Sequence, residues 1–144
     1  FGKAGDCANL SLGGGYNQTL NDAVTTAALN VGIYFTLAAG NESQDAKNVS
    51  PASANGKNVY TISAIASDSN FASFSNYGNP PIDYAAPGVN ILSLKKGGGT
   101  TTMSGTSMAA PHACAVLMVT GGVPSSSGSA NGDPDSNADP IIHL

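Results

Sequence analysis

The stretch Gly105-Thr106-Ser107-Met108-Ala109-Ala110-Pro111-His112 decides the fold of this chain. It opens an apolar segment that predicts a helix from Ser107 to about Thr120, with Pro111 tolerated near the first turn. In isolation, a serine at the start of a helix is most simply an N-cap. The stretch also differs from the Gly-x-Ser-x-Gly elbow of α/β-hydrolases, because Ala109 stands where the elbow has glycine. The role of Ser107 therefore depends on the rest of the chain.

Three further segments precede this stretch. They are Ser11-Leu12-Gly13-Gly14-Gly15-Tyr16, Ala38-Ala39-Gly40-Asn41, and Phe71-Ala72-Ser73-Phe74-Ser75-Asn76-Tyr77-Gly78 with the following Ala86-Pro87-Gly88. In order and spacing, the four segments together resemble the subtilase family of subtilisin-like serine proteases, and the proteinase K-like members in particular. The resemblance covers about residues 9–122, which is most of the chain.

The resemblance implies a catalytic role for two residues. Ser107 would be the nucleophile of acyl transfer, and it would need a neighbouring base because a serine hydroxyl is weak at its own pKa. Asn41 would donate its side-chain NH2 to the oxygen of the tetrahedral intermediate, together with the backbone N–H of Ser107. Taken alone, Asn41 is more typical of a turn after Gly40, so its role depends on the other segments.

The resemblance also implies a substrate-binding pocket with two walls. One wall would consist of Ser11, Leu12, Gly13 and Gly14, and the opposite wall of Ala38, Ala39 and Gly40. The first wall would present its backbone to an extended substrate, which would pair with it like an added strand. The glycines considered alone predict a turn, and a phosphate-binding loop is disfavoured because no Lys-Ser/Thr pair follows them.

Hydrophobic periodicity predicts an α/β fold independently of any family. Apolar residues recur at helical spacing from Gln18 to Asn30, and Gly32 is well placed to end that helix. The apolar run Ile33 to Ala39 predicts a strand that is buried on both faces, as in parallel sheets. With further strands at Val59 to Ala66 and later, we predict a parallel sheet with flanking helices, the C-terminal portion of a subtilisin-like fold. Ligands bind beyond the carboxyl ends of such strands, and Gly13 and Asn41 both follow strand ends.

The composition changes after Gly121. We assign residues 1–122 to the C-terminal part of a subtilase catalytic domain, which would carry the nucleophile, the oxyanion hole and the specificity pocket. Residues 123–144 form a Gly/Ser/Asp-rich C-terminal tail, and the segment Ser125 to Asp139 predicts loop rather than regular structure. Within it, residues 133–139 alternate oxygen ligands like a calcium loop but lack its central glycine and final glutamate, so a flexible acidic tail is the better interpretation.

Asp83 is the one candidate metal ligand outside the tail. It matches a carboxylate that binds structural calcium in proteinase K-like subtilases, where backbone carbonyls near Lys57 and Val59 would complete the site. A solvated aspartate is the alternative, and the residues leave both interpretations open. No cofactor is expected for catalysis.

The chain does not show the residues that would activate Ser107. In this family the triad runs Asp, His, Ser along the chain, and no Asp-Ser/Thr-Gly or His-Gly-Thr segment is present. The two histidines do not fit, because His112 belongs to the nucleophile helix and His143 is next to the last residue. We therefore expect a polypeptide substrate, and we expect an N-terminal half that carries Asp and His as the partner of this chain.

The composition limits the kinds of partner that the chain can bind. The chain has 144 residues, a net charge of −4 and only five basic residues, which argues against nucleic acid and anionic membrane partners. Family resemblance implies a secreted protein. The two cysteines, Cys7 and Cys114, are too few for a disulfide framework. Cys114 should be buried in the nucleophile helix, whereas Cys7 either pairs outside the chain or stays a free thiol like Cys114.

The sequence thus predicts the lineage of a serine endopeptidase that cleaves peptide bonds through an acyl-enzyme at Ser107, with this chain inactive on its own. The alternative is a non-catalytic subtilase-like module that binds extended peptides or a protein partner. A calcium-binding structural domain is a weaker third interpretation.

Overall fold

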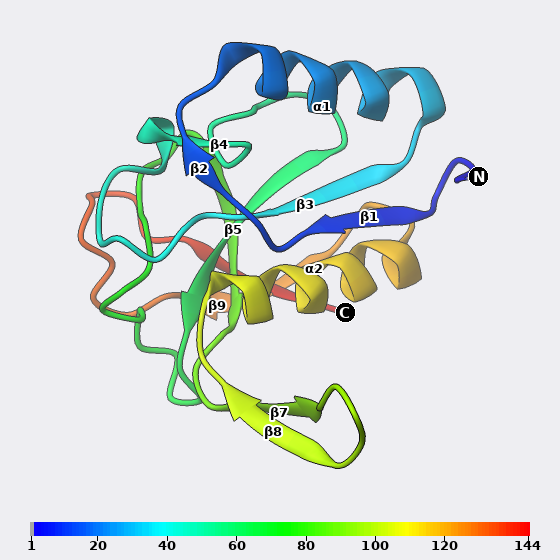
Figure 1. The fold of residues 1–144 in the computed structure, drawn as a ribbon. Coiled ribbons are helices and arrows are strands. Elements are labelled where there is room, and N and C mark those ends of the chain that lie inside the picture. Colours follow the sequence, from blue (N-terminus) through cyan, green and yellow to red (C-terminus); the bar gives the residue numbers. More distant parts are fainter. Residues whose placement is uncertain (1) are drawn as a thin grey trace.

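The computed structural model describes residues 2–144, and its centre is one predominantly parallel sheet (Figure 1). The elements in chain order are β1 (Cys7–Leu10), β2 (Gly14–Gly15), α1 (Gln18–Val31), β3 (Tyr34–Ala38), the 3-10 helix η1 (Ala46–Asn48), β4 (Val49–Ser50), β5 (Val59–Ile65), β6 (Ile82–Pro87), β7 (Ile91–Leu94), β8 (Thr100–Met103), α2 (Thr106–Thr120), β9 (Ser125–Ser129) and β10 (Pro140–His143). Within these residues the main sheet has the strand order β1-β3-β5-β6-β10-β9, and β1, β3, β5 and β6 run parallel. The predicted α/β class is confirmed.

The segment from β1 through α1 to β3 forms the predicted strand–helix–strand crossover. Cys7 pairs with Tyr34 and Leu10 with Leu37, in parallel register. The helix begins where the side chain of Asn17 accepts a hydrogen bond from the Leu20 N–H at 3.0 Å, which satisfies one of its free donors. It ends at Gly32, whose φ of 71° lies in the left-handed region that favours glycine.

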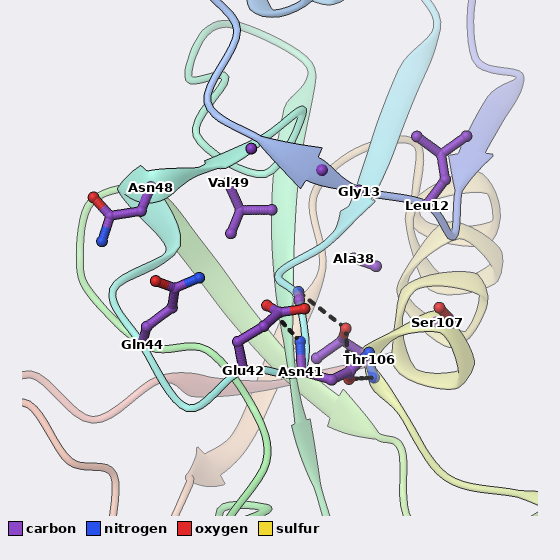
Figure 2. Close-up of a pocket in the computed structure, with 13 residues that line it drawn as sticks. Leu12, Gly13, Ala38, Asn41, Glu42, Gln44, Asn48, Val49, Thr106 and Ser107 are labelled. Carbon is purple, nitrogen blue, oxygen red and sulfur yellow. Dashed lines mark hydrogen bonds between the residues drawn. The ribbon is translucent and has the colours of Figure 1, made fainter.

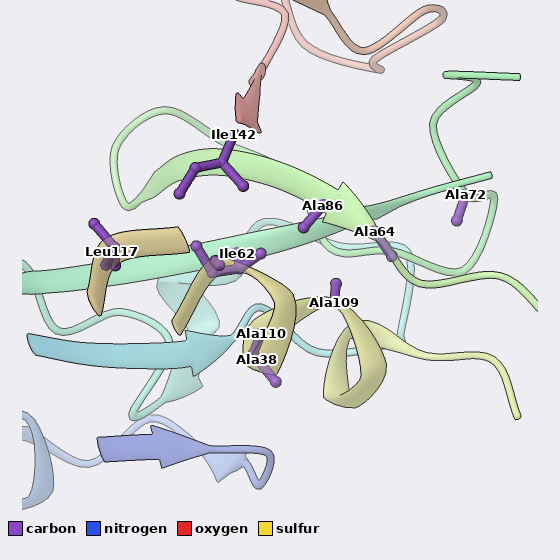
Figure 3. Packing of buried hydrophobic residues seen from close by; sticks show 10 residues of the cluster. Ala38, Ile62, Ala64, Ala72, Ala86, Ala109, Ala110, Leu117 and Ile142 are labelled. Carbon is purple, nitrogen blue, oxygen red and sulfur yellow. The ribbon is translucent and has the colours of Figure 1, made fainter. Parts of the chain in front are cut away.

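Alternate side chains of the sheet pack against the two helices on opposite faces. On one face, Phe35 and Leu37 of β3 pack with Val24 and Ala28 of α1. On the other face, Ala38 packs under α2 in a cluster of mostly small residues. Figure 3 shows this cluster, whose buried members are Ala38, Ile62, Ala64, Ala72, Ala86, Ala109, Ala110, Ala113, Leu117 and Ile142. The small alanines let α2 lie close to the sheet, and that proximity fixes the position of its first turn.

Two glycines permit the close approach at the start of α2. A Cβ added to Gly88 would come within 2.6 Å of the Ala64 Cβ and within 2.9 Å of the Gly105 carbonyl oxygen. The Gly88 carbonyl in turn accepts a hydrogen bond from the Gly105 N–H at 2.8 Å. The segment Ala86-Pro87-Gly88 therefore packs directly against the turn that leads into α2.

The C-terminal segment corrects our prediction of a loop or tail. Within Ser125 to Asp139, the first five residues form β9, which pairs antiparallel with β10, and β10 joins the sheet parallel to β6. Ile141 and Ile142 are buried, and Ile142 belongs to the cluster under α2. The prediction failed because every residue of β9 is exposed and its Ser-rich sequence carries no alternation of apolar and polar residues.

The cysteines also correct our prediction. Cys7 and Cys114 form a disulfide with each other, with their Cα atoms 5.8 Å apart, so neither is a free thiol or pairs outside the chain. Cys114 is buried in α2 as expected, with 8% of its surface exposed. The pairing was not foreseen because 107 residues separate the two positions, and only the packing of α2 beside β1 brings them together.

The sheet edge at β1 and the hairpin of β7 and β8 are two surfaces that the main body leaves open. Strand β1 lies at the edge of the sheet and pairs only with β3 within residues 2–144. A separate hairpin, β7 with β8, extends from the body below the start of α2 (Figure 1). In this described part of the chain, no helix combines the length and apolar character needed to cross a membrane.

Candidate active site

Three loop or turn segments meet at the first turn of α2. Two of them follow the carboxyl ends of the parallel strands β1 and β3, where ligands bind in such sheets, and the third leads into Ser107. Figure 2 shows Ser107 at the start of α2, with Thr106 and Asn41 beside it and Leu12 and Gly13 across the opening. We call this assembly of residues 11–14, 38–41 and 105–107 the rim.

Ser107 is held by a hydrogen bond that involves its backbone and not its hydroxyl. The Ser11 Oγ donates to the Ser107 carbonyl oxygen at 2.7 Å. In a regular helix this carbonyl would accept from the N–H four residues later, but that residue is Pro111, which has no N–H. Ser11 therefore replaces the missing bond and links residues 11–14 to the first turn of α2. The Ser107 Oγ makes no hydrogen bond within residues 2–144 and remains available.

Asn41 is oriented by Thr106, which is fully buried. The Asn41 Oδ1 accepts hydrogen bonds from the Thr106 N–H at 2.8 Å and from the Thr106 Oγ1 at 3.1 Å. The same Oγ1 accepts from the Gly40 N–H at 3.1 Å. Because the oxygen of the Asn41 amide is committed to Thr106, its NH2 group points away from Thr106 and is free to donate.

Asn76 holds the loop that follows β3 in place. Sequence analysis assigned no role to this residue. Its side chain is fully buried; its Oδ1 accepts from the Glu42 and Gln44 N–H groups at 3.1 Å, and its Nδ2 donates to the Ala39 carbonyl at 2.8 Å. A Cβ on Gly40, whose φ is 104°, would overlap the Asn76 amide. The segment containing Asn76 was recognised, but only the buried amide contacts show what it does.

The rim borders an open cavity of about 360 Å³. Of the predicted substrate-binding residues, five line it: Leu12, Gly13, Gly14, Ala38 and Gly40. Ser11 lies outside the lining and contacts Ser107, whereas Ala39 is fully buried behind the wall. Four lining residues lie outside every segment that was recognised in the sequence, and they are Glu42, Gln44, Asn48 and Val49. They follow the recognised Ala38–Asn41 segment, so their proximity in sequence was the only available signal.

The histidines of the chain lie where sequence analysis expected them. His112 is on α2, and its Nδ1 is 2.8 Å from the Met108 carbonyl oxygen. This contact makes it a structural residue of the helix, as predicted. His143 lies at the end of β10, and its Nδ1 is 3.0 Å from the Leu144 carbonyl oxygen. Within residues 2–144 neither imidazole forms a hydrogen bond with the Ser107 hydroxyl.

Asp83 lies on β6, away from the rim. Its Oδ2 accepts a hydrogen bond from the Thr61 N–H at 2.9 Å. Burial raises the pKa of this carboxyl to about 6, although the bond from Thr61 opposes the change. The second oxygen makes no hydrogen bond within the described chain, so one carboxylate oxygen is available to an ion.

Comparison with known proteins agrees with this geometry. The model of the subtilase family matches residues 3–125. The chain is 54% identical over 116 residues to Subtilisin-like protease 3 of Arthroderma otae, which is 81% of this chain and 28% of that protein. It is 53% identical over 112 residues to Subtilisin-like protease 4 of Trichophyton equinum, or 78% and 27% of the two chains. The chain thus spans less than a third of the length of these relatives.

Solved structures show the same likeness. The crystal structure of a cold adapted subtilisin-like serine proteinase superposes with a TM-score of 0.84 at 34% identity, covering 98% of this chain and 55% of that one. A protease from Pseudoalteromonas arctica superposes with a TM-score of 0.69 at 33% identity, covering 78% and 38%. The first of these alignments includes nearly all of the C-terminal segment, beyond the last residue that the family model matches.

Proposed function

This chain belongs to the subtilase family, and from that premise we propose that it is the nucleophile-bearing part of a serine endopeptidase. The proposal rests on two polar groups at the rim that have no hydrogen-bond partner in the described part of the chain. The Ser107 hydroxyl and the Asn41 NH2 have no partner within residues 2–144, while the atoms around them are bonded. They border one cavity, next to the N-terminus of a helix.

The proposed reaction is acyl transfer. The Ser107 Oγ attacks the carbonyl carbon of the scissile peptide bond, and its proton passes to the imidazole of a histidine outside these residues. The carbonyl oxygen becomes an oxyanion that accepts from the Asn41 NH2 and from the Ser107 N–H, which belongs to the unpaired first turn of α2. The imidazolium then protonates the leaving amine, the C–N bond breaks, and water hydrolyses the resulting ester.

The substrate would bind in extended form. The backbone of residues 11–13 would pair with it as an added strand, and the side chain before the scissile bond would enter the cavity. Leu12, Ala38 and Val49 give the cavity an apolar lining, which supports a preference for apolar side chains. Glu42, Gln44 and Asn48 make the far side polar, so the preference should be broad.

The histidine and its orienting aspartate would come from an N-terminal half of the protease. Two surfaces support this. The free edge of β1 can accept a further strand. Beside Ser107, a groove of about 370 Å³ is lined mainly by apolar groups of α2 and β7, among them Ile91, Met108 and Pro111. A segment seated on both surfaces would reach the Ser107 hydroxyl. The relatives contain ample further chain to provide it.

Two secondary proposals accompany this one. A structural calcium ion would bind at Asp83, whose free carboxylate oxygen supports the assignment, with backbone carbonyls near Lys57 and Val59 as the remaining ligands. The protein would be secreted, because the Cys7–Cys114 disulfide is stable mainly in oxidising compartments.

A chimera tests the proposed function. The part of Subtilisin-like protease 3 that precedes its matched region is fused ahead of this chain, and hydrolysis of a chromogenic peptide is measured. We expect activity from the chimera, a loss on the order of 10⁶-fold for Ser107→Ala, as for loss of a triad residue in subtilisin, and none from the isolated chain. A folded chimera that binds the peptide without cleaving it would instead support the non-catalytic peptide-binding module.

A further inference from the structure

The second polar centre of the molecule lies far along the chain from the rim. The loop between β9 and β10 packs against the loop that precedes β6, where the Asn79 Nδ2 donates to the Asn137 carbonyl at 2.7 Å. From the sheet, the Ser63 Oγ donates to the Asp139 Oδ2. We call the group Ser63, Asn79, Asp133, Asp135 and Asp139 the C-terminal corner.

Three oxygen atoms of the C-terminal corner are buried without a hydrogen-bond partner in the described chain. They are the Asn79 Oδ1, the Asp135 Oδ2 and the Asp139 Oδ1. Asp139 is fully buried as a whole residue. An amide oxygen and ionised carboxylate oxygens can only accept, so these atoms cannot satisfy one another. Leaving such atoms unpaired costs on the order of 1–3 kcal/mol each, and more for charged groups.

The three groups meet in one place. The Asn79 Nδ2 donates to the Asn137 carbonyl, and the Asn137 N–H donates to the Asp135 Oδ1 at 2.7 Å. The N–H groups of Asp135 and Asp139 both donate to the Asp133 carboxylate. These hydrogen bonds gather Asn79, Asp135 and Asp139 around the one loop between β9 and β10.

No basic side chain compensates the negative charge of the corner. The five basic residues of the chain are all lysines and the last is Lys96, so none belongs to the C-terminal segment. Among residues 2–144 the single ion pair joins Lys47 and Asp45. Asp133 uses its carboxylate differently, because its Oδ1 and Oδ2 accept from the Asp135 and Asp139 N–H groups at 3.3 and 3.0 Å. Asp133 therefore shapes the loop, and Asp135 and Asp139 keep free oxygens.

We propose that the C-terminal corner is a divalent-cation site of calcium type, with the Asn79 Oδ1, the Asp135 Oδ2 and the Asp139 Oδ1 as its protein ligands. An all-oxygen set with two carboxylates and one amide suits Ca²⁺, which accepts irregular loop geometry and completes its coordination with carbonyls and water. Zn²⁺ is disfavoured because no nitrogen or sulfur ligand is present. No group of three or more His, Cys, Asp or Glu side chains in residues 2–144 is arranged to hold a metal, and the proposed set differs from such groups in using an amide.

A cation here would fasten the C-terminal segment to the body. It would link the β9–β10 loop to Asn79, which lies just ahead of β6, the strand that β10 pairs with. Since Ile142 of β10 packs under α2, the ion would stabilise the cover of the nucleophile helix without touching the rim. The inference does not depend on the proposed protease activity.

Calcium titration of the chelator-treated chain tests the proposal. The chain carries Asp83→Asn, so that the site proposed at Asp83 does not contribute, and calcium chloride is added in a calorimeter. We expect one ion per chain, with a Kd of about 10⁻⁴ to 10⁻³ M as in extracellular modules. Adding Asp135→Asn should weaken binding at least about tenfold, because one charged ligand becomes neutral. Asp22→Asn, an exposed change of equal charge on α1, should leave the Kd unchanged.

Two results would overturn the proposal. One is no binding by the folded Asp83→Asn chain up to about 10 mM calcium, above the weakest affinities known for such modules. The other is a Kd that Asp135→Asn does not change. If Asp135→Asn unfolds the chain, Asn79→Ala gives the same comparison without altering charge, with folding checked by circular dichroism.

Discussion

The rim and the C-terminal corner are both dense in polar groups, but they differ in what is left unpaired. At the rim, buried groups such as those of Thr106 and Asn76 are bonded, and the two free groups, the Ser107 hydroxyl and the Asn41 NH2, can each donate into an open cavity. At the corner, the free atoms are buried acceptor oxygens that face no donor.

The difference indicates two kinds of binding. Free donors at a solvent-accessible helix terminus suit a ligand that develops negative charge during a reaction. Buried acceptors with no basic neighbour suit a ligand that stays positive and bound. We therefore propose a catalytic role for the rim and a structural role for the C-terminal corner, and the following experiments separate the two.

The largest expected effect is at the rim. In the active chimera, Asn41→Ala should lower kcat about 10²–10³-fold, as measured for the oxyanion asparagine of subtilisin, because the developing charge loses a donor. KM should change little, since the interaction forms only in the transition state. Steady-state peptide hydrolysis gives both constants. Asn48→Ala, in the same cavity but away from Ser107, is the control, and an equal loss of kcat there would contradict the assignment.

The link between β1 and α2 should have the next largest effect. Replacing Cys7 and Cys114 together by alanine should lower the free energy of unfolding by about 2–4 kcal/mol, because the bond closes a loop of 107 residues. Urea unfolding followed by circular dichroism measures the change. Calcium binding at the corner should persist in this variant under native conditions. Its loss without unfolding would show that the two regions are coupled.

A smaller effect is expected from the C-terminal segment. Ile142→Val removes one methylene from the cluster under α2 and should cost about 0.5–1.5 kcal/mol. Val123→Ala is the control, because Val123 is 80% exposed and should contribute almost nothing. A flexible tail would give no effect at Ile142 either, and equal midpoints for both variants would restore that interpretation.

A last prediction concerns the pH dependence of the free energy of unfolding that Asp83 causes in chelator. Burial raises the pKa of this carboxyl in the folded state to about 6, above its ordinary value of 3.8, so the folded state holds the proton more tightly than the unfolded state. The free energy of unfolding should therefore fall as the pH rises from about 4 to about 6. Asp83→Asn removes this dependence, so its melting temperature should gain on that of the parent chain across this range. A constant difference between pH 4 and 7 would contradict the raised pKa.

The segments that form the rim could be located from the sequence because local patterns mark them. Local patterns predicted the start of α2 around Ser107, the end of β1 at the glycines that follow it, and β3 from its apolar run. The carboxyl ends of parallel strands lie at the same edge of a sheet, which brings these segments together. Four of the cavity residues were missed, as was the role of Asn76, because these depend on which side chain is buried beneath which loop.

The C-terminal segment and the disulfide could not be predicted in the same way. Strand β9 is exposed along its whole length and Ser-rich, so it has no apolar face, and β10 is held by contacts with β6 and α2 that lie far away in sequence. The Cys7–Cys114 bond depends equally on the packing of α2 beside β1. Long-range packing decides these features, and one sequence contains no local pattern for it.

Fluorophosphonate labelling of Ser107 tests the central claim most directly, because the reagent reacts with serines that a base activates. Intact mass and peptide mapping would be recorded for the isolated chain and for the chimera. The account predicts one label on Ser107 of the chimera and none on the isolated chain, in whose described residues neither histidine hydrogen-bonds that hydroxyl. Labelling of the isolated chain at a comparable rate, or a folded chimera without label, would contradict it.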